Sequence, residues 1–147
     1  MARVKLHLPQ NFIFSTEIAV RIGDINYGGH LGNDSVLSLV HEARIRFLSK
    51  YGFSEKDVDG VGLIMCDVII VYKSESFYGD NLLVKVTLAD FTYTGCDFLY
   101  RLSNNETDKE VARAKTGIVF YDYHNRKIVP IPRKFNDSFL NLYERFL

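Results

Sequence analysis

Three side chains that could take part in acid–base or hydrogen-bonding chemistry lie close together near the start of the chain. Within residues 21–34, RIGDINYGGHLGND, they belong to Asp24, Asn26 and His30. A carboxylate or an imidazole can accept a proton from water at neutral pH, whereas an amide can only orient the water. The segment therefore holds two candidate bases and one hydrogen-bonding residue, although Asp24 and His30 could equally serve to hold a turn together.

A long helix is expected directly after this turn. Asn33 or Asp34 can cap its first N–H groups, and apolar residues then recur at helical spacing. These residues are Val36, Leu39, Val40, Ala43 and Phe47. The pattern stops near Tyr51 and Gly52, where glycine suits the end of a helix. Free N–H groups and the helix dipole make the start of this helix a predicted site for an oxyanion.

The rest of the chain is predicted to be mostly strand. Alternating apolar residues indicate a strand over residues 12–22, and further strand patterns span residues 62–72, 82–91, 98–102 and 111–123. The short polar breaks between the last strands are typical of hairpins, and a C-terminal helix is expected over residues 134–147. One early helix among antiparallel strands predicts an α+β fold, and the open edges of such a sheet favour pairing with a second copy.

Composition narrows the class of protein. The 147 residues suit one domain, taken here as residues 1–147, and the formal net charge of zero gives no field that would favour nucleic acid or an anionic membrane. Cys66 and Cys96 lack metal-ligand or redox spacing, so free thiols, no metal and no redox cofactor are expected. No apolar run has the length of a signal peptide or a membrane span, and a cytoplasmic location is the expectation.

The order of these motifs resembles the hotdog-fold acyl-CoA thioesterases of the 4-hydroxybenzoyl-CoA thioesterase type. That family shows roughly R-x-x-D-x-D-x-x-G-H-x-N-N, followed by a helix with E-x-A-R. The matching residues here are Arg21, Asp24, Asn26, Gly29, His30, Gly32 and Asn33, then Glu42, Ala43 and Arg44. The similarity continues in order through Gly79-Asp80, Gly95 and residues 111–114 to Pro132. It implies an antiparallel sheet of about five to six strands wrapped around a long central helix.

The resemblance also implies a thioester hydrolase with a backbone amide as the oxyanion donor. By alignment, the N–H of Asn33 would polarise the thioester carbonyl. The usual catalytic aspartate of the family is Asn26 here, so Asn26 would hold water while His30 or Glu42 acts as the base, with Asp24 and Asp34 as further candidates. Glu42 could instead form only a solvated helix pair with Arg46.

The same resemblance implies the substrate, the binding residues and the partners. Tyr27, Gly28, Gly29 and Gly32 would lie against an acyl-CoA substrate. Gly32 replaces the first asparagine of the family pattern, which alters the helix entry. Basic residues available for the CoA phosphates are Lys73, Arg101, Arg113, Lys115 and Lys127. A homodimer or homotetramer is expected, and the two alternatives are an acyl-ACP thioesterase and a non-catalytic acyl-CoA binding protein that lost its base with Asn26.

Overall fold

The computed structural model describes residues 2–139, which form an antiparallel sheet around a long helix. The strands are β1 (Phe14–Ala19), β2 (Gly62–Tyr72), β3 (Asn81–Ala89), β4 (Gly95–Asn104), β5 (Glu110–Asp122) and β6 (Lys127–Ile128). Their order across the sheet is β1-β3-β4-β5-β2, with β6 paired to β5. A 3-10 turn η1 (Ile22–Asp24) and the helices α1 (Asn33–Lys50) and α2 (Arg133–Ser138) complete the elements. The predicted α+β hotdog architecture is confirmed.

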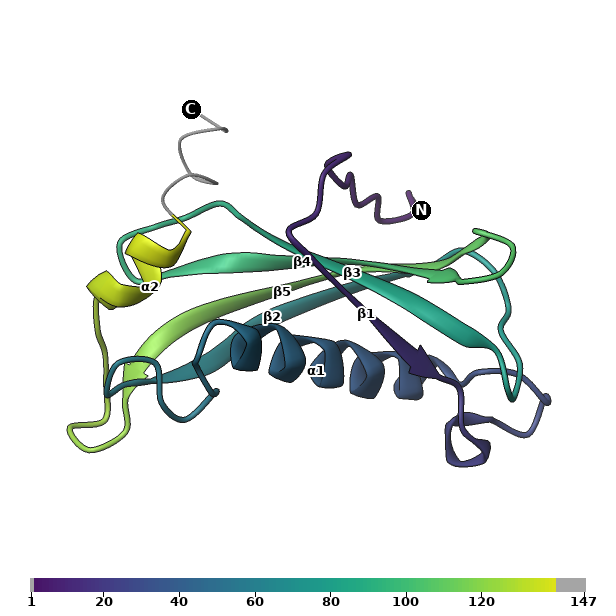
Figure 1. Ribbon diagram of the computed structural model, residues 1–147, viewed down its shortest axis with the longest axis horizontal. Coiled ribbons are helices and arrows are strands. Elements are labelled where there is room, and N and C mark those ends of the chain that lie inside the picture. The colour runs from purple at the N-terminus through teal and green to yellow at the C-terminus, as the bar shows by residue number, and fades with distance from the viewer. Residues whose placement is uncertain (1, 140–147) are drawn as a thin grey trace.

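Helix α1 runs along one face of the sheet, and the N-terminal segment lies on the other side (Figure 1). The 18 residues of α1 span ~27 Å. The five apolar residues that predicted it are all buried: Val36, Leu39, Val40, Ala43 and Phe47. Their ring and aliphatic groups meet the alternating inner positions of β3, where Leu82, Val84, Val86 and Leu88 are each 0% exposed. Phe47 sits at the centre of this core, edge-to-face with Phe14 and Phe98.

Two element boundaries differ from the predicted ones for tertiary reasons. The first strand ends at Ala19 because Val20 donates its N–H to the carbonyl of Asp80 and the chain then enters η1. The strand predicted over residues 98–102 begins earlier, because Gly95 is the first residue of β4. A Cβ at this position would collide with the Ile118 carbonyl oxygen of β5, so glycine allows the two strands to approach.

The C-terminal helix begins as expected but is described only in part. Helix α2 covers Arg133–Ser138, and Phe135 and Phe139 pack on each other with ring centroids 4.8 Å apart. The remainder of the predicted helix, residues 140–147, lies outside the described residues. No helix within residues 2–139 is long and apolar enough to cross a membrane.

Strand β2 forms one open edge of the sheet and extends beyond the cover of α1. Several of its side chains on the helix side are partly exposed to solvent. Met65, Val68 and Tyr72 are 43, 39 and 49% exposed. A β-bulge between Met65 and Asp67 interrupts its pairing with β5. The result is a groove between α1 and β2 with an apolar floor, called here the α1–β2 groove.

Candidate active site

The turn before α1 is held by the side chain of Asp24. This carboxylate is buried at 5% exposure, accepts the backbone N–H of Arg21 at 2.9 Å and lies 3.5 Å from the Arg21 guanidinium. The carbonyl of Asp24 accepts the N–H of Gly32 at 2.9 Å, which brings the chain back to the start of the helix. Asp24 thus supports the turn, as its simpler interpretation predicted, and its Oδ2 atom is engaged inside the turn.

Asn26 closes the loop that carries His30. Its Oδ1 atom accepts the N–H groups of Gly28 at 2.9 Å and His30 at 3.4 Å, and its own N–H donates to the His30 carbonyl at 2.9 Å. Because both partners of the side chain are N–H donors, the amide oxygen must face them and Nδ2 must point away from them. Nδ2 has no acceptor among residues 2–139. Asn26 therefore has a hydrogen-bond donor that is unpaired within residues 2–139, and it has no group that can act as a base.

The glycines of the turn keep side chains out of a crowded corner. A Cβ at Gly28 would lie 3.3 Å from both Asn26 Oδ1 and His30 Nε2, and one at Gly32 would lie 2.7 Å from Asp34 Oδ1. Gly29 has a φ of +84°, a conformation that favours glycine. Tyr27 projects fully into solvent, so it does not line a cavity of this single chain.

His30 faces a cavity of about 240 Å³ at the N-terminus of α1. Its Nδ1 lies 3.3 Å from the carbonyl oxygen of Leu31, which can only accept, so Nδ1 carries the proton of the neutral ring. Nε2 then has a free lone pair, and it makes no hydrogen bond within the described part of the chain. The imidazole lines the cavity, and its Nε2 atom, which lies beside Gly28, is available as a base or a hydrogen-bond acceptor.

The first turn of α1 has free backbone donors, and its first residue, Asn33, lines the same cavity. Gly32 is the N-cap and provides no side-chain cap. The N–H groups of Ser35 and Val36 donate to the Gly32 carbonyl, whereas those of Asn33 and Asp34 find no acceptor anywhere in residues 2–139. Two amides at the positive end of a helix suit a developing negative charge.

Strand β2 brings two further residues to the helix start, and sequence reasoning had not assigned either to the catalytic centre. The Tyr72 hydroxyl donates to the Asn33 carbonyl at 2.9 Å. Burial, and after it the charge of Asp34, raises the pKa of Tyr72, so the phenol keeps its proton and Asp34 lies nearby. Lys73 lines the His30 cavity directly after Tyr72. In the sequence, Lys73 was one of five basic residues available for the CoA phosphates, and no local pattern marked Tyr72.

Glu42 is not brought to this cavity within one chain. Glu42 lies nine residues after Asn33 on α1. Nine residues make about two and a half helical turns and ~13 Å, so Glu42 lies on the opposite side of the helix from Asn33. There it accepts Arg46 Nε at 3.0 Å in a partly exposed ion pair. Arg46 in turn donates to Thr16 Oγ1 and to the Glu17 carbonyl, both at 2.8 Å, and so fastens α1 to β1.

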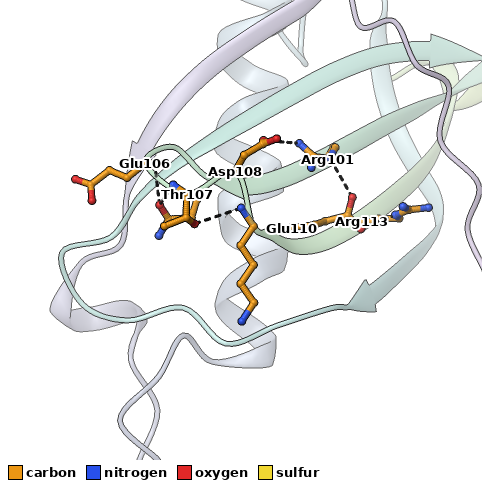
Figure 2. Close-up of polar contacts among 8 residues, drawn as sticks. Arg101, Glu106, Thr107, Asp108, Glu110 and Arg113 are labelled. Atoms are coloured by element: carbon orange, nitrogen blue, oxygen red, sulfur yellow. Dashed lines mark hydrogen bonds and ion pairs between the residues drawn. The ribbon is translucent and has the colours of Figure 1, made fainter.

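Most of the basic residues considered for CoA phosphates are already paired. Figure 2 shows Arg101 and Arg113 converging on Glu110 of β5, with N–O distances of 3.0 and 2.7 Å. Burial alone would raise the pKa of Glu110, but Arg113 and Arg101 lower it on balance. Lys115 is bonded to Asp67 at 2.9 Å. Lys127 lies on β6 and pairs with Asp122 of β5. This position is far along β5 from Ala112, the residue that pairs with Tyr72.

The chain matches a family of known proteins over most of its length. The family model of the thioesterase-like superfamily matches residues 20–139. A 1,4-dihydroxy-2-naphthoyl-CoA hydrolase of Synechocystis sp. is 28% identical over 134 residues, which cover 88% of this chain and 96% of the relative.

Solved structures extend the comparison to three dimensions. A 1,4-dihydroxy-2-naphthoyl-CoA thioesterase from Synechocystis superposes with a TM-score of 0.80 and 26% identity, over 88% of this chain and 96% of the other. A hypothetical protein from Staphylococcus aureus in complex with CoA gives a TM-score of 0.81 over 95% and 89% of the chains; at 18% identity it shows the fold alone. The chain therefore belongs to the thioesterase-like superfamily and has its hotdog fold.

Proposed function

We propose that this protein hydrolyses acyl-CoA thioesters to a carboxylic acid and free CoA, with the thioester carbonyl bound at the N-terminus of α1. The observation that carries the proposal is the pair of free amides, Asn33 N–H and Asp34 N–H, at the start of α1, where Asn33 and His30 line one cavity. The relatives that act on naphthoyl-CoA thioesters support CoA as the carrier.

The chemistry follows from the positions of these groups. The carbonyl oxygen accepts the Asn33 and Asp34 N–H groups, which stabilise the negative charge that forms as water attacks the carbonyl carbon. His30 Nε2 takes a proton from that water and returns it to the sulfur as the C–S bond breaks. Asn26 Nδ2 donates a hydrogen bond to the water or the substrate, and Lys73 attracts the anionic carrier to the cavity.

The decisive test removes one backbone donor without disturbing the helix. Asn33 is the first helical residue, where proline is well tolerated, and Gly32 before it has φ −70° and ψ 148°, which suits a residue that precedes proline. Asn33→Pro should lower kcat about 10²–10³-fold, the usual cost of one oxyanion donor. Asn33→Ala keeps the N–H and should retain most activity. Equal activity in the two variants would show that this amide is not the donor.

The same assay addresses the alternative functions. Turnover of acyl-ACP in preference to the matching acyl-CoA would assign the other carrier. Binding of acyl-CoA without release of free thiol, unchanged in His30→Ala, would favour the non-catalytic protein, for which the amide at position 26 in place of a carboxylate is the supporting observation.

We further propose a homodimer that pairs two β2 edges and encloses the α1–β2 groove. The half-exposed Met65, Val68 and Tyr72 support this interface, because pairing would cover them. Val68→Asp should give a monomer in analytical ultracentrifugation, whereas Val4→Asp, on the exposed N-terminal segment, should sediment like the wild type. Unchanged sedimentation of Val68→Asp would rule out this interface. The two unpaired cysteines support a cytoplasmic location.

A further inference from the structure

Large apolar side chains are exposed to solvent on two loops next to the candidate active site. One loop joins β1 to α1 over residues 20–32, and the other joins β2 to β3 over residues 73–80. Their exposed apolar residues, called here the loop patch, are Ile22 at 72%, Tyr27 at 107%, Phe77 at 50% and Tyr78 at 65% exposure. A group of large exposed apolar side chains in one place marks a site of interaction with a protein or a membrane.

The two loops are joined into one unit by main-chain hydrogen bonds. Val20 donates its N–H to the Asp80 carbonyl at 2.8 Å, and the Val20 carbonyl accepts the N–H of Gly79 at 3.0 Å. Leu31, two residues before the start of α1, donates to the Ser76 carbonyl at 2.7 Å. The loop patch therefore belongs to one surface, at the end of the sheet where α1 begins (Figure 1).

The β2–β3 loop has a fixed local structure that keeps its two aromatic residues exposed. Asp80 Oδ2 accepts the Ser76 hydroxyl and the Phe77 N–H, both at 2.9 Å, and Asp80 donates its own N–H to the Phe77 carbonyl at 3.0 Å. Ser76 is 1% exposed, so the loop is anchored in the protein at this residue and exposes the next two, Phe77 and Tyr78. Because the loop is already ordered, little conformational freedom is lost when a partner covers these rings.

The same two loops line the cavity that contains His30. The lining includes Leu31 from the first loop and Lys73, Ser74 and Glu75 from the second. A surface bound to the loop patch would therefore lie beside the candidate active site. An acyl thioester joins an apolar acyl chain to a charged, water-soluble carrier, and a lipid surface collects such molecules because each methylene that enters the lipid favours binding.

The charged side chains around the loop patch do not select a strongly charged partner. Arg21 and Lys73 are exposed cations, whereas Asp34 and Glu75 are exposed anions. Charges of both signs leave a weak local field, in keeping with the formal net charge of zero for the whole chain. Recognition must then come from the apolar and aromatic groups. Tyrosine suits the boundary of a lipid bilayer, because its ring is apolar and its hydroxyl stays hydrated.

We propose that the loop patch docks onto the surface of a phospholipid bilayer and turns the candidate active site toward it. A bilayer is fluid, so it accepts side chains from separate loops without a matching groove, whereas a protein partner needs a complementary surface. Docking goes beyond the proposed hydrolysis and can be measured without turnover, so the failure of one does not decide the other.

The first test uses fluorescence, because the chain contains no tryptophan and a single introduced one reports only on its own surroundings. Tyr78→Trp should emit at shorter wavelength when phosphatidylcholine vesicles are added, since the ring leaves water for the lipid boundary. Tyr93→Trp is the matched control. Tyr93 is 78% exposed but lies beyond the far end of β3, a strand of nine residues and ~30 Å that begins beside the loop patch. The emission of this control should not change.

The second test removes the aromatic rings of the β2–β3 loop. Phe77→Ser combined with Tyr78→Ser should lower the partition coefficient of the protein onto the same vesicles about 10-fold or more, as measured by co-sedimentation, because two large apolar side chains are lost. Tyr93→Ser removes one exposed ring from the other end of the sheet and should bind vesicles like the wild type. Thermal unfolding of each variant checks that it is folded.

Several results would overturn the proposal. An unchanged emission of Tyr78→Trp with vesicles, or an equal change in Tyr93→Trp, would show that the loop patch does not enter the lipid. Emission at short wavelength in buffer alone, dependent on protein concentration, would show that a second copy of the chain covers the patch instead. Equal vesicle binding by the wild type and the combined variant would exclude Phe77 and Tyr78 as the contact.

Discussion

The Tyr72 hydroxyl, at the end of β2, donates a 2.9 Å hydrogen bond to the carbonyl of Asn33, the first residue of α1. The bond joins the open edge of the sheet to the helix end whose amides are free. It fixes the direction in which the first turn of α1 faces the His30 cavity. Tyr72 also lines that cavity, so the same residue shapes the site and holds it in place.

Tyr72→Phe should therefore change activity more than stability. The ring and its packing remain, and a single hydrogen bond of a half-exposed residue contributes ~0.5–1.5 kcal/mol to folding. We expect a free energy of unfolding lowered by no more than about this amount and a kcat lowered about 3- to 10-fold, because the oxyanion donors lose their fixed orientation. Urea unfolding and steady-state kinetics measure the two quantities. A full retention of kcat would show that the helix start needs no such support.

Asn26→Asp should keep its thermal stability but hydrolyse the thioester less efficiently. Either oxygen of the new carboxylate can accept the Gly28 and His30 N–H groups that Oδ1 accepts now, and a negative charge near a helix N-terminus is favourable. The variant loses the Nδ2 donor, so we expect an unchanged or higher Tm and a kcat/KM about 10-fold lower. Thermal unfolding and thioester hydrolysis are the measurements. A higher rate would instead mean that a carboxylate base works better here than His30.

Phe47→Ala should be among the most destabilising single changes in the helix. Its ring is fully buried and contacts the rings of Phe14, Phe98 and Phe139 at 5.5–5.7 Å between centroids. Removing a buried phenylalanine side chain typically lowers the free energy of unfolding by ~3–5 kcal/mol. Ile45→Ala, at 44% exposure on the same helix, is the control and should lower it by less than about 1 kcal/mol. Similar values for the two variants would contradict this description of the core.

Arg44 Nε donates to Glu55 Oε1 at 2.7 Å, and this ion pair should make stability depend on pH in the acid range. The folded state lowers the pKa of Glu55, so the pair contributes its full stability above the ordinary value of about 4.5 and loses it as pH falls through the folded value. Wild type should therefore exceed Glu55→Gln in unfolding free energy at pH 7, and the difference should shrink below about pH 4.5. Urea unfolding from pH 3 to 7 measures it. A difference that is constant over this range would show that Glu55 does not interact with Arg44 as an ion.

Features of the fold that are set by residues close in sequence could be predicted, whereas features set by contacts between strands could not. Helix α1 carries its own signals, a polar start and apolar residues at helical spacing, and it begins at the predicted residue. Gly95 lies before the strand predicted over residues 98–102, yet it belongs to β4, where β5 closely approaches its backbone. Only the tertiary structure reveals that approach.

The candidate site also has one part that the sequence could predict and one part that it could not. The contacts among Asp24, Asn26 and His30 are local and follow from turn chemistry. Tyr72 and Lys73 join them only through the pairing of β2 with β5, which no local pattern reveals. Glu42 was a candidate base from the resemblance, but it lies nine residues after Asn33 and therefore on the far side of α1.

The free N–H groups at the start of α1 have a consequence for how this protein can change over time. A main-chain donor is present with every amino acid except proline, so the identities of residues 33 and 34 can drift while the proposed oxyanion donors persist. Loss of the donor needs either a proline or a shift of the helix end itself. Substitutions at Asp24, whose side chain holds the turn before that end, would therefore disable the site more readily than substitutions at the residues that make the contact.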